Sequence, residues 1–444
     1  MPVGITTILP DAASRVRELE RIVLELLSSW GYREIILPTF EYLDVLTPGL
    51  HTQIIEKGYQ LTDRTTGRTL VLRPDATAQI ARTIAMGMLG DSVPLRLAYR
   101  TSVYRYEPEH VGRDREQLQI GAELAGLAGP AGDAEIISLM VDCLLRLGVK
   151  AFRISLGHVG FLQALLRGSG LSSSEQKQAE QAAARRNVPE LESIVSGRRL
   201  CRPHVRAILE APALYGGEEV LARGRALAGR DRGVRAALDR LAAVYRILQF
   251  TGHGEHILLD LGELRGFEYY DGIVFDVFAD GVGYEIGGGG RYDRLIGQFG
   301  RDLPSTGFAF DVDRLFRVVE AVDTVRTRNG PEYLLATTSD LMGAAMTLAR
   351  QLRLVGMRVV PGTVPIQGTT ALRSVLAEAG RVRARAVVCL GITGIKNDEV
   401  LVVHDVVRAR KLRAPSVAAL RAQGAEVFRR ETVPDALKAR GQDR

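Results

Sequence analysis

At 444 residues the chain is too long for one ordinary hydrophobic core, so we expect two or three domains. Its composition, 46% hydrophobic and 25% charged, is typical of a soluble globular protein and excludes disordered and fibrous chains. The formal charge of +6 arises from basic residues, mostly Arg, spread among almost as many acids. This distribution favours a solvated surface over a dedicated nucleic-acid patch.

The three cysteines, Cys143, Cys201 and Cys389, show no CxxC spacing and no histidine companion. We therefore expect no disulfide framework, no metal site, no cofactor and a reducing, cytoplasmic location. The N-terminus lacks a basic segment followed by an apolar run, and no uncharged stretch could span a bilayer, so we expect no membrane association.

The first predicted element is an amphipathic helix that begins near Asp11, which would cap it. Apolar residues between Val16 and Leu27 recur on one helical face. Gly31 ends this helix, and residues 33–37 are typical of a strand that stops at Pro38.

Residues 59–127 contain strand-like runs joined mostly by loops, with one helix near residues 76–88. Strands joined by loops favour a mainly antiparallel sheet, so the predicted fold class is α+β. Residues about 162–250 are rich in Ala, Arg, Glu and Leu with helical spacing, which predicts a helical insertion between two strands of the sheet.

The strand pattern resumes at residues 273–278, and a helix over residues 312–319 closes a first domain of residues 1–320. Residues 321–331 are polar and contain Asn-Gly-Pro, which predicts a linker. Residues 332–444 alternate strands and helices, which indicates a C-terminal α/β domain of ordinary size.

Two charged clusters in the first half of the chain have the chemistry of a binding site. Asp75 either caps the helix that follows it or offers a carboxylate to a ligand amine. In the segment from Tyr104 to Glu123, a hairpin around a basic loop would place Arg105 and Glu107 opposite Gln119 and Glu123. An Arg there suits a phosphate or carboxylate, because its guanidinium donates two parallel hydrogen bonds; surface ion pairs, which contribute little, are the alternative.

Two further clusters lie in the second half of the first domain. Leu264 to Gly272 contains Arg265, Tyr269 and Tyr270 and precedes a run of four glycines, which would let backbone approach a ligand. The GxGxxG and GxxxxGK[ST] spacings are absent, which excludes dinucleotide-binding and P-loop sites. Gly307 to Leu315 places Arg314 at the start of an amphipathic helix.

Taken in order, these clusters resemble the signature of class II histidyl-tRNA synthetases across residues 1–320. The helix–strand–Pro38 unit looks like motif 1, the dimer-forming element of that family. Tyr104 to Glu123 looks like motif 2, Gly307 to Leu315 like motif 3, and Leu264 to Gly272 like the histidine-specific segment. The resemblance implies a class II aminoacyl-tRNA-synthetase-like antiparallel sheet with flanking helices.

Residue by residue, the resemblance implies a histidine pocket, in which acids and Gln hold the ammonium and imidazole and tyrosines wall the ring. Its members would be Asp75, Thr77, Gln119, Glu123, Arg265, Tyr269 and Tyr270. Arg265 would meet the ligand carboxylate. The resemblance also implies a vestigial phosphate-binding site formed by three arginines, Arg105, Arg113 and Arg314.

Three departures from the synthetase pattern argue against adenylate formation. Synthetases stack adenine on an aromatic residue of a Phe-His-Gln segment; this chain has Gln117-Leu118-Gln119, and the missing stacking is worth about 1–3 kcal/mol. Asp311 stands where synthetases usually have Gly, and its carboxylate would repel a triphosphate. The N-terminal RGxxD pattern is present only as Val3 to Thr7.

Other segments resemble the regulatory subunit of ATP phosphoribosyltransferase, a catalytically inactive paralogue of the synthetases. They are Leu156 to Gly160, Leu214 to Val220 with its Tyr-Gly-Gly, Ile286 to Asp293, and Phe310 to Arg314. The resemblance implies a non-catalytic subunit that activates a short-form catalytic subunit in the first step of L-histidine biosynthesis and transmits feedback inhibition by histidine. It also implies a dimer within a hetero-oligomer of four plus four subunits, with no tRNA partner.

Two alternatives remain open. Because Arg105, Arg265 and Arg314 are retained, the chain could be an active histidyl-tRNA synthetase, which histidine-dependent ATP–pyrophosphate exchange would reveal. The C-terminal domain faintly resembles an anticodon-binding domain, through its strand–helix–strand order and the segment from Leu352 to Gly356. An RNA-binding sensor would show salt-sensitive tRNA binding without aminoacylation.

Overall fold

The computed structural model describes residues 4–50, 52–106, 115–196, 202–229, 231–263, 269–325, 330–354, 356–362, 371–390, 400–404 and 410–413. Several positions named in the sequence analysis lie outside the described residues: Val3, Glu107, Arg113, Cys201, Leu264 and Arg265. The chain divides into two compact units, Met1–Thr327 and Arg328–Arg444. In the part of the chain that is described, no helix has the length and apolar character needed to cross a membrane.

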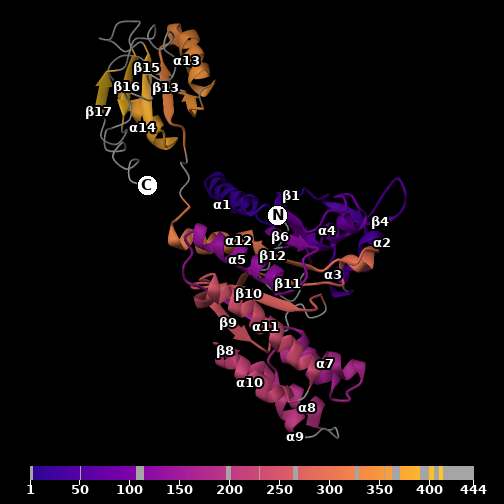
Figure 1. Ribbon diagram of the computed structural model, residues 1–444. Coiled ribbons are helices and arrows are strands. Elements are labelled where there is room, and N and C mark those ends of the chain that lie inside the picture. The colour runs from indigo at the N-terminus through magenta and orange to yellow at the C-terminus, as the bar shows by residue number, and fades with distance from the viewer. Residues whose placement is uncertain are drawn as a thin grey trace. The chain divides into compact units, whose positions relative to one another are not determined.

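The first unit is built on a nine-stranded sheet with the order β1-β5-β6-β12-β11-β10-β7-β9-β8 (Figure 1). Its strands are β1 (Arg33–Glu34), β5 (Leu95–Tyr104), β6 (Glu116–Ala125), β7 (Phe152–His158), β8 (Tyr215–Gly216), β9 (Ile257–Asp260), β10 (Ile273–Ala279), β11 (Glu285–Arg291) and β12 (Ser305–Asp311). Only the pairs β1–β5 and β7–β9 are parallel among these described strands. The expected α+β class with a mainly antiparallel sheet is confirmed.

One face of this sheet is covered by three helices that pack together, α1 (Pro10–Ser29), α5 (Pro130–Arg146) and α12 (Val312–Val322). Alternate strand residues such as Ala98 and Ile120 belong to the core on this face. Helix α1 begins one residue before the predicted start, because Pro10 occupies its first turn and Leu9 is the N-cap. Asp11 therefore lies inside the helix rather than capping it.

The opposite face is covered by α4 (Ala76–Ala85), whose Ile80 and Ile84 pack with Leu97 and Tyr99 of β5. A small sheet of β2 (Phe40–Tyr42), β4 (Thr69–Leu72) and β3 (Gln60–Thr62) lies in the same part of the chain, with α2 (Leu43–Leu46) and α3 (Thr52–Glu56). The first turn of α4 is closed by Asp75, whose carboxylate accepts a 3.0 Å bond from the Ala78 N–H.

The hairpin of β5 and β6 differs in register from the sequence prediction. Tyr104 pairs with Glu116, so that Gln119 lies opposite Thr101 and not opposite Arg105. The register is fixed where the strands end, because the Arg105 N–H donates to the Arg115 carbonyl at 3.0 Å. Arg105 consequently follows the strand and turns toward α4.

The helical insertion connects β7 to its parallel neighbour β9. Its helices are α6 (Gly160–Arg167), α7 (Ser173–Ala184), α8 (Val188–Ser196), α9 (Arg202–Glu210), α10 (Glu219–Ala228) and α11 (Arg232–Phe250). They gather at the end of the sheet where β9 and β8 lie, with α7 to α10 in the lower part of Figure 1. Helix α11 packs on α5 and so joins the insertion to the sheet.

The second unit has a five-stranded sheet with the order β14-β13-β15-β16-β17. Its elements are β13 (Tyr333–Thr337), α13 (Met342–Leu354), β14 (Val359–Pro361), α14 (Ala371–Arg381), β15 (Ala386–Leu390), β16 (Val400–His404) and β17 (Arg410–Arg413). Strand β13 is parallel to β14 and β15, and separate apolar clusters include α13 on one face and α14 on the other. Helix α12 of the first unit covers the first two residues of the predicted linker and ends at Val322, with Asp323 as its C-cap.

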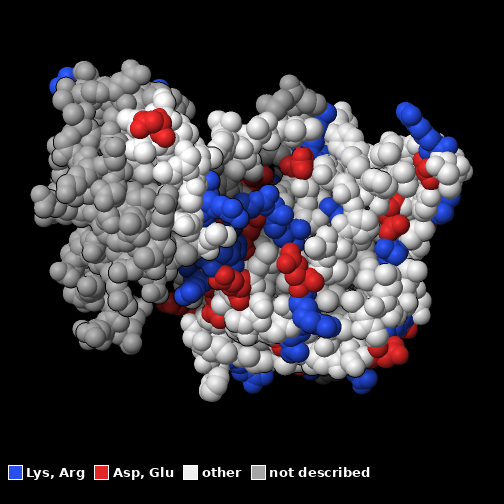
Figure 2. All heavy atoms as spheres, turned by 90° about the horizontal axis from the view of Figure 1, so that it is seen from above, with Lys and Arg blue, Asp and Glu red and all other residues white. Residues whose placement is uncertain are grey.

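On the face drawn in Figure 2, basic and acidic side chains lie beside one another. Helix α1 illustrates such pairing, because Arg21 contacts Glu18 at 2.6 Å and Glu25 at 2.5 Å. Exposed ion pairs of this kind add little to the free energy of unfolding.

Candidate functional site

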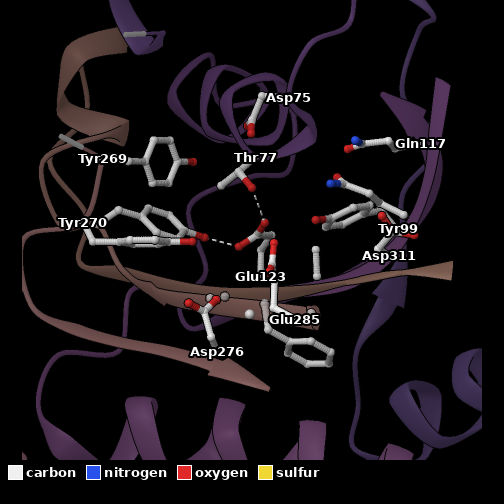
Figure 3. A pocket seen from close by; sticks show the side chains of 18 of the residues that line it. Asp75, Thr77, Tyr99, Gln117, Glu123, Tyr269, Tyr270, Asp276, Glu285 and Asp311 are labelled. Carbon is white, nitrogen blue, oxygen red and sulfur yellow. Dashed lines mark hydrogen bonds between the residues drawn. The ribbon is translucent and has the colours of Figure 1, made fainter. Parts of the chain in front are cut away.

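A pocket of about 340 Å³ lies on the face of the large sheet that α4 covers. Figure 3 shows Asp75 and Thr77 reaching it from α4, and Tyr269 and Tyr270 walling the opposite side from Gln117. The structure brings together the described residues of the predicted histidine pocket, which are Asp75, Thr77, Gln119, Glu123, Tyr269 and Tyr270. Arg105 and Arg314, two of the three predicted phosphate-binding residues, also line this pocket.

Glycines of β11 and β12 form part of the pocket wall. A Cβ atom on Gly307 would overlap the Glu123 carboxylate, and one on Gly288 would overlap the Asp276 carboxylate. Side chains are therefore excluded at these two positions. This requirement explains why the glycine run lies inside a strand, where glycine is otherwise unfavourable.

Glu123 is the buried acid of the pocket. Its Oε1 accepts a 2.7 Å hydrogen bond from Thr77, and its Oε2 accepts one from the Tyr292 hydroxyl. Burial raises the pKa of Glu123 to about 8, against the lowering effect of these two hydrogen bonds. Without a ligand, the Glu123 carboxyl is thus largely protonated at neutral pH. A bound cation or hydrogen-bond donor would favour its ionised form.

Aromatic rings surround Glu123. The ring of Tyr269 lies 5.2 Å from that of Tyr270 and 5.5 Å from that of Tyr292, in tilted or edge-on arrangements. Burial raises the pKa of all three phenols, and of Tyr99, so their hydroxyls stay neutral. Such a wall combines apolar ring faces with hydroxyl groups, which suits a small planar ligand.

Arg105 is partly engaged within the protein. Its Nε donates to the Pro74 carbonyl at 2.6 Å, and its Nη2 lies 3.3 Å from Asp75 Oδ2. Asp75 therefore takes the first of its two expected roles, the helix cap, while its role toward a ligand amine stays a prediction. One oxygen caps α4, and the other faces a cation at the pocket.

Arg314 is held by two carboxylates. Its Nη1 donates to Glu285 Oε1 at 2.9 Å and to the Glu285 carbonyl at 2.8 Å, while its Nε lies 3.2 Å from Asp311 Oδ2. Asp311 also caps α12 by accepting a 3.1 Å bond from the Arg314 N–H. These contacts engage the Nη1 and Nε atoms of the guanidinium with carboxylates.

The charge of the pocket is acidic. Five carboxyl residues line it, Asp75, Glu123, Asp276, Glu285 and Asp311, against the two arginines. Each arginine already faces a carboxylate, so the lining favours an ammonium or imidazolium group over a triphosphate. In the described residues, no group of three or more potential ligands is arranged to hold a metal ion.

Several lining residues were not among the sequence predictions, notably Tyr99, Asp276, Glu285 and Tyr292. A signal existed for Tyr292, which directly follows the glycine run and Arg291. Glu285 and Asp276 had none, because only the pairing of β10, β11 and β12 brings them to the pocket.

Comparisons with known proteins agree on one family. A family model described as histidyl-tRNA synthetase matches residues 4–315. The ATP phosphoribosyltransferase regulatory subunit of Geobacter metallireducens is 35% identical over 356 residues, covering 80% of this chain and 82% of that relative.

Two solved structures have similar folds. One, described as an ATP phosphoribosyltransferase regulatory subunit/histidyl-tRNA synthetase from Bacillus halodurans, matches with a TM-score of 0.76 at 29% identity and covers 88% of this chain and 98% of its own. Histidyl-tRNA synthetase from Nostoc sp. matches with a TM-score of 0.78 at 19% identity, covering 97% and 99% of the two chains. The second likeness concerns the fold alone, and it extends through the C-terminal unit.

Proposed function

The chain belongs to the family of ATP phosphoribosyltransferase regulatory subunits, which share the histidyl-tRNA synthetase fold, and from this premise we propose how its pocket serves that role. The protein is a non-catalytic subunit that partners a phosphoribosyltransferase. The catalytic partner is the short-form subunit, which performs the first step of L-histidine biosynthesis. This protein activates it and makes it responsive to histidine.

The observation that carries the non-catalytic assignment is the engagement of Arg314 by Glu285 and Asp311. A phosphate-binding arginine must offer free N–H groups, and here the guanidinium donates to Glu285 and faces Asp311 at 2.9 and 3.2 Å. A triphosphate at Arg314 would compete with both ion pairs and would place its charge beside two carboxylates. Gln117, at the position of the adenine-stacking ring, offers no aromatic face either.

The same pocket retains the chemistry of histidine recognition. Glu123 and Asp75 would hold the ammonium and imidazole groups, Thr77 and Gln119 would supply neutral hydrogen-bonding partners, and Tyr269 and Tyr270 would enclose the ring. Arg265, outside the described residues, would receive the ligand carboxylate. We therefore propose L-histidine as the ligand, with Arg105, Arg113 and Arg314 as remnants of a phosphate site.

The assembly is proposed from the family resemblance. The helix–strand unit of α1 and β1 would form a dimer, and the dimers would join the catalytic subunit in a four-plus-four hetero-oligomer in the cytoplasm. We propose that tRNA is not a partner of this assembly.

Active histidyl-tRNA synthesis is the second candidate, favoured by the retention of the arginines and by the joint description of the Bacillus halodurans structure. Histidine-dependent ATP–pyrophosphate exchange by the purified chain separates the two. We expect exchange no greater than that of a histidine-free control. Robust exchange would make the protein a synthetase.

A further inference from the structure

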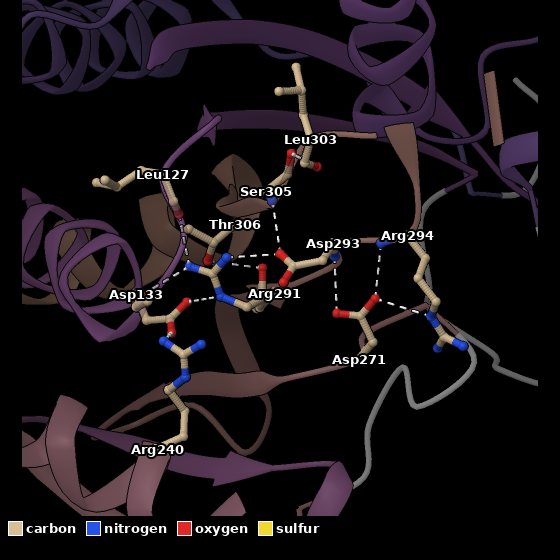
Figure 4. A network of polar contacts seen from close by, with 12 residues as sticks. Leu127, Asp133, Arg240, Asp271, Arg291, Asp293, Arg294, Leu303, Ser305 and Thr306 are labelled. Atoms are coloured by element: carbon tan, nitrogen blue, oxygen red, sulfur yellow. Dashed lines mark hydrogen bonds and ion pairs between the residues drawn. The ribbon is translucent and has the colours of Figure 1, made fainter. Parts of the chain in front are cut away.

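A buried ion network lies at the end of β11, beside the pocket but not part of its lining (Figure 4). Arg291 Nε donates to Asp133 Oδ1 at 2.7 Å, and Arg291 Nη1 donates to Asp293 Oδ1 at 2.8 Å. The side chains of Arg291 and Asp133 are 3% and 0% exposed. Separating or removing either partner of such a buried pair would leave an uncompensated charge. The two side chains are therefore expected to stay in contact.

The network is connected to the pocket through two neighbouring residues. Arg291 directly precedes Tyr292, whose hydroxyl donates to Glu123. Asp271 directly follows Tyr270, and its carboxylate accepts from the Asp293 N–H at 3.0 Å. The Asp271 N–H donates to the Arg291 carbonyl at 2.9 Å. A change in the position of either pocket tyrosine therefore acts on the backbone that carries this network.

The network also reaches the helical insertion. Arg240 of α11 points its Nη1 at Asp133 Oδ2 of α5, at a distance of 4.0 Å. Both atoms are buried, and neither has a hydrogen-bond partner in the described part of the chain. Since a charged N–H···O bond spans about 2.8 Å, the pair is open by roughly 1 Å. Asp133 is fully buried, whereas the Arg240 side chain is 30% exposed, so a small shift of Arg240 could close the gap.

We propose that the Asp133–Arg240 contact couples occupancy of the pocket to the position of the helical insertion. The proposal rests on the proposed histidine pocket. A ligand that bonds to Glu123 competes with the Tyr292 hydroxyl, and the adjustment of Tyr292 moves Arg291 and with it Asp133. The contact with Arg240 then closes and draws α11 toward α5. Coupling of this kind is reciprocal, so the insertion in turn tunes ligand affinity.

The test measures hydrogen–deuterium exchange of α11 with and without saturating L-histidine, alongside calorimetric histidine binding. In the full-length wild-type chain, histidine is expected to slow exchange in α11. Arg240→Met removes the charge and keeps a long aliphatic side chain. This variant should abolish the slowing of exchange in α11, while its affinity for histidine changes less than about tenfold. Arg240→Lys, which restores a cation, should recover part of the slowing.

Arg235→Met is the matched control, since Arg235 lies on the same helix and is exposed. Its Nε donates a hydrogen bond to the Gly229 carbonyl. It should behave as wild type. If histidine binds and slows α11 equally in wild type and in Arg240→Met, the coupling proposal is wrong while the pocket stands. If wild type does not bind histidine, the pocket assignment fails and the coupling falls with it.

Discussion

Arg314 and Asp311 face each other across the first turn of α12, with Arg314 Nε 3.2 Å from Asp311 Oδ2. The same carboxylate caps the helix, so one side chain both starts α12 and neutralises the arginine that α12 presents. Glu285 completes the neutralisation from β11 at 2.9 Å. The carboxylate that is proposed to repel a triphosphate thus also stabilises the start of α12.

Freeing Arg314 should restore nucleotide affinity. Glu285→Gln combined with Asp311→Asn removes two charges, and Asn remains a good helix cap, so α12 should persist. We expect ATP to bind at least about tenfold more tightly than to wild type, equivalent to about 1.4 kcal/mol, measured by calorimetry. Adding Arg314→Gln should cancel this gain. Equal ATP affinity in wild type and the double variant would show that the two carboxylates are not the obstacle.

Histidine binding should depend on the buried acid and its aromatic wall. Glu123→Ala or Tyr270→Ala should lower the affinity for L-histidine at least about tenfold. The first variant removes the partner of a polar ligand group, and the second removes an aromatic contact with the ligand. Calorimetry measures this change. Tyr215→Ala, on exposed β8, serves as the control and should bind as wild type. Unchanged affinity in both pocket variants would place the regulatory site elsewhere.

The glycine wall should tolerate no side chain. Gly307→Ala would place a methyl group on the Glu123 carboxylate, so we expect loss of histidine binding and a decrease of about 1–3 kcal/mol in the free energy of unfolding. Gly283→Ala is the matched control, because no atom lies within 4 Å of its added Cβ. Urea unfolding and calorimetry report the two effects. Normal binding by Gly307→Ala would contradict the pocket geometry.

Glu123 should make stability fall as pH rises. Its pKa is about 8 in the folded protein against 4.5 for an ordinary Glu, so the folded state keeps a proton that the unfolded state releases. The free energy of unfolding contributed by this group is therefore full below pH 4.5 and is lost progressively up to about pH 8. Glu123→Gln should flatten this decline in urea unfolding measured from pH 5.5 to 9, whereas exposed Glu34→Gln should not. Equal slopes in wild type and Glu123→Gln would show that Glu123 is ionised when buried.

The sequence predicted the fold class and much of the pocket, because local signals coincided there. Helical spacing marked α1, strand runs marked the antiparallel sheet, and ordered motifs placed Asp75, Glu123 and Tyr270 together. The register of β5 and β6 was predicted wrongly, since it depends on where the hairpin closes rather than on residue type.

The remaining site features depend on tertiary pairing. Glu285 reaches Arg314 only because β11 lies beside β12, and Asp276 meets the wall because β10 lies beside β11. The Asp133–Arg291 pair joins residues 158 positions apart, a separation at which no periodicity carries information. Such contacts follow from the assembled sheet and cannot be obtained from a single segment.

The central claim is that this protein activates a separate phosphoribosyltransferase and makes it sensitive to histidine. The most direct measurement combines the purified chain with the short-form catalytic subunit and records phosphoribosyl transfer to ATP while L-histidine is titrated. The account predicts co-purification, a gain of activity over the catalytic subunit alone, and loss of that gain as histidine rises. An unchanged catalytic rate, with robust histidine-dependent ATP–pyrophosphate exchange by the chain alone, would contradict it.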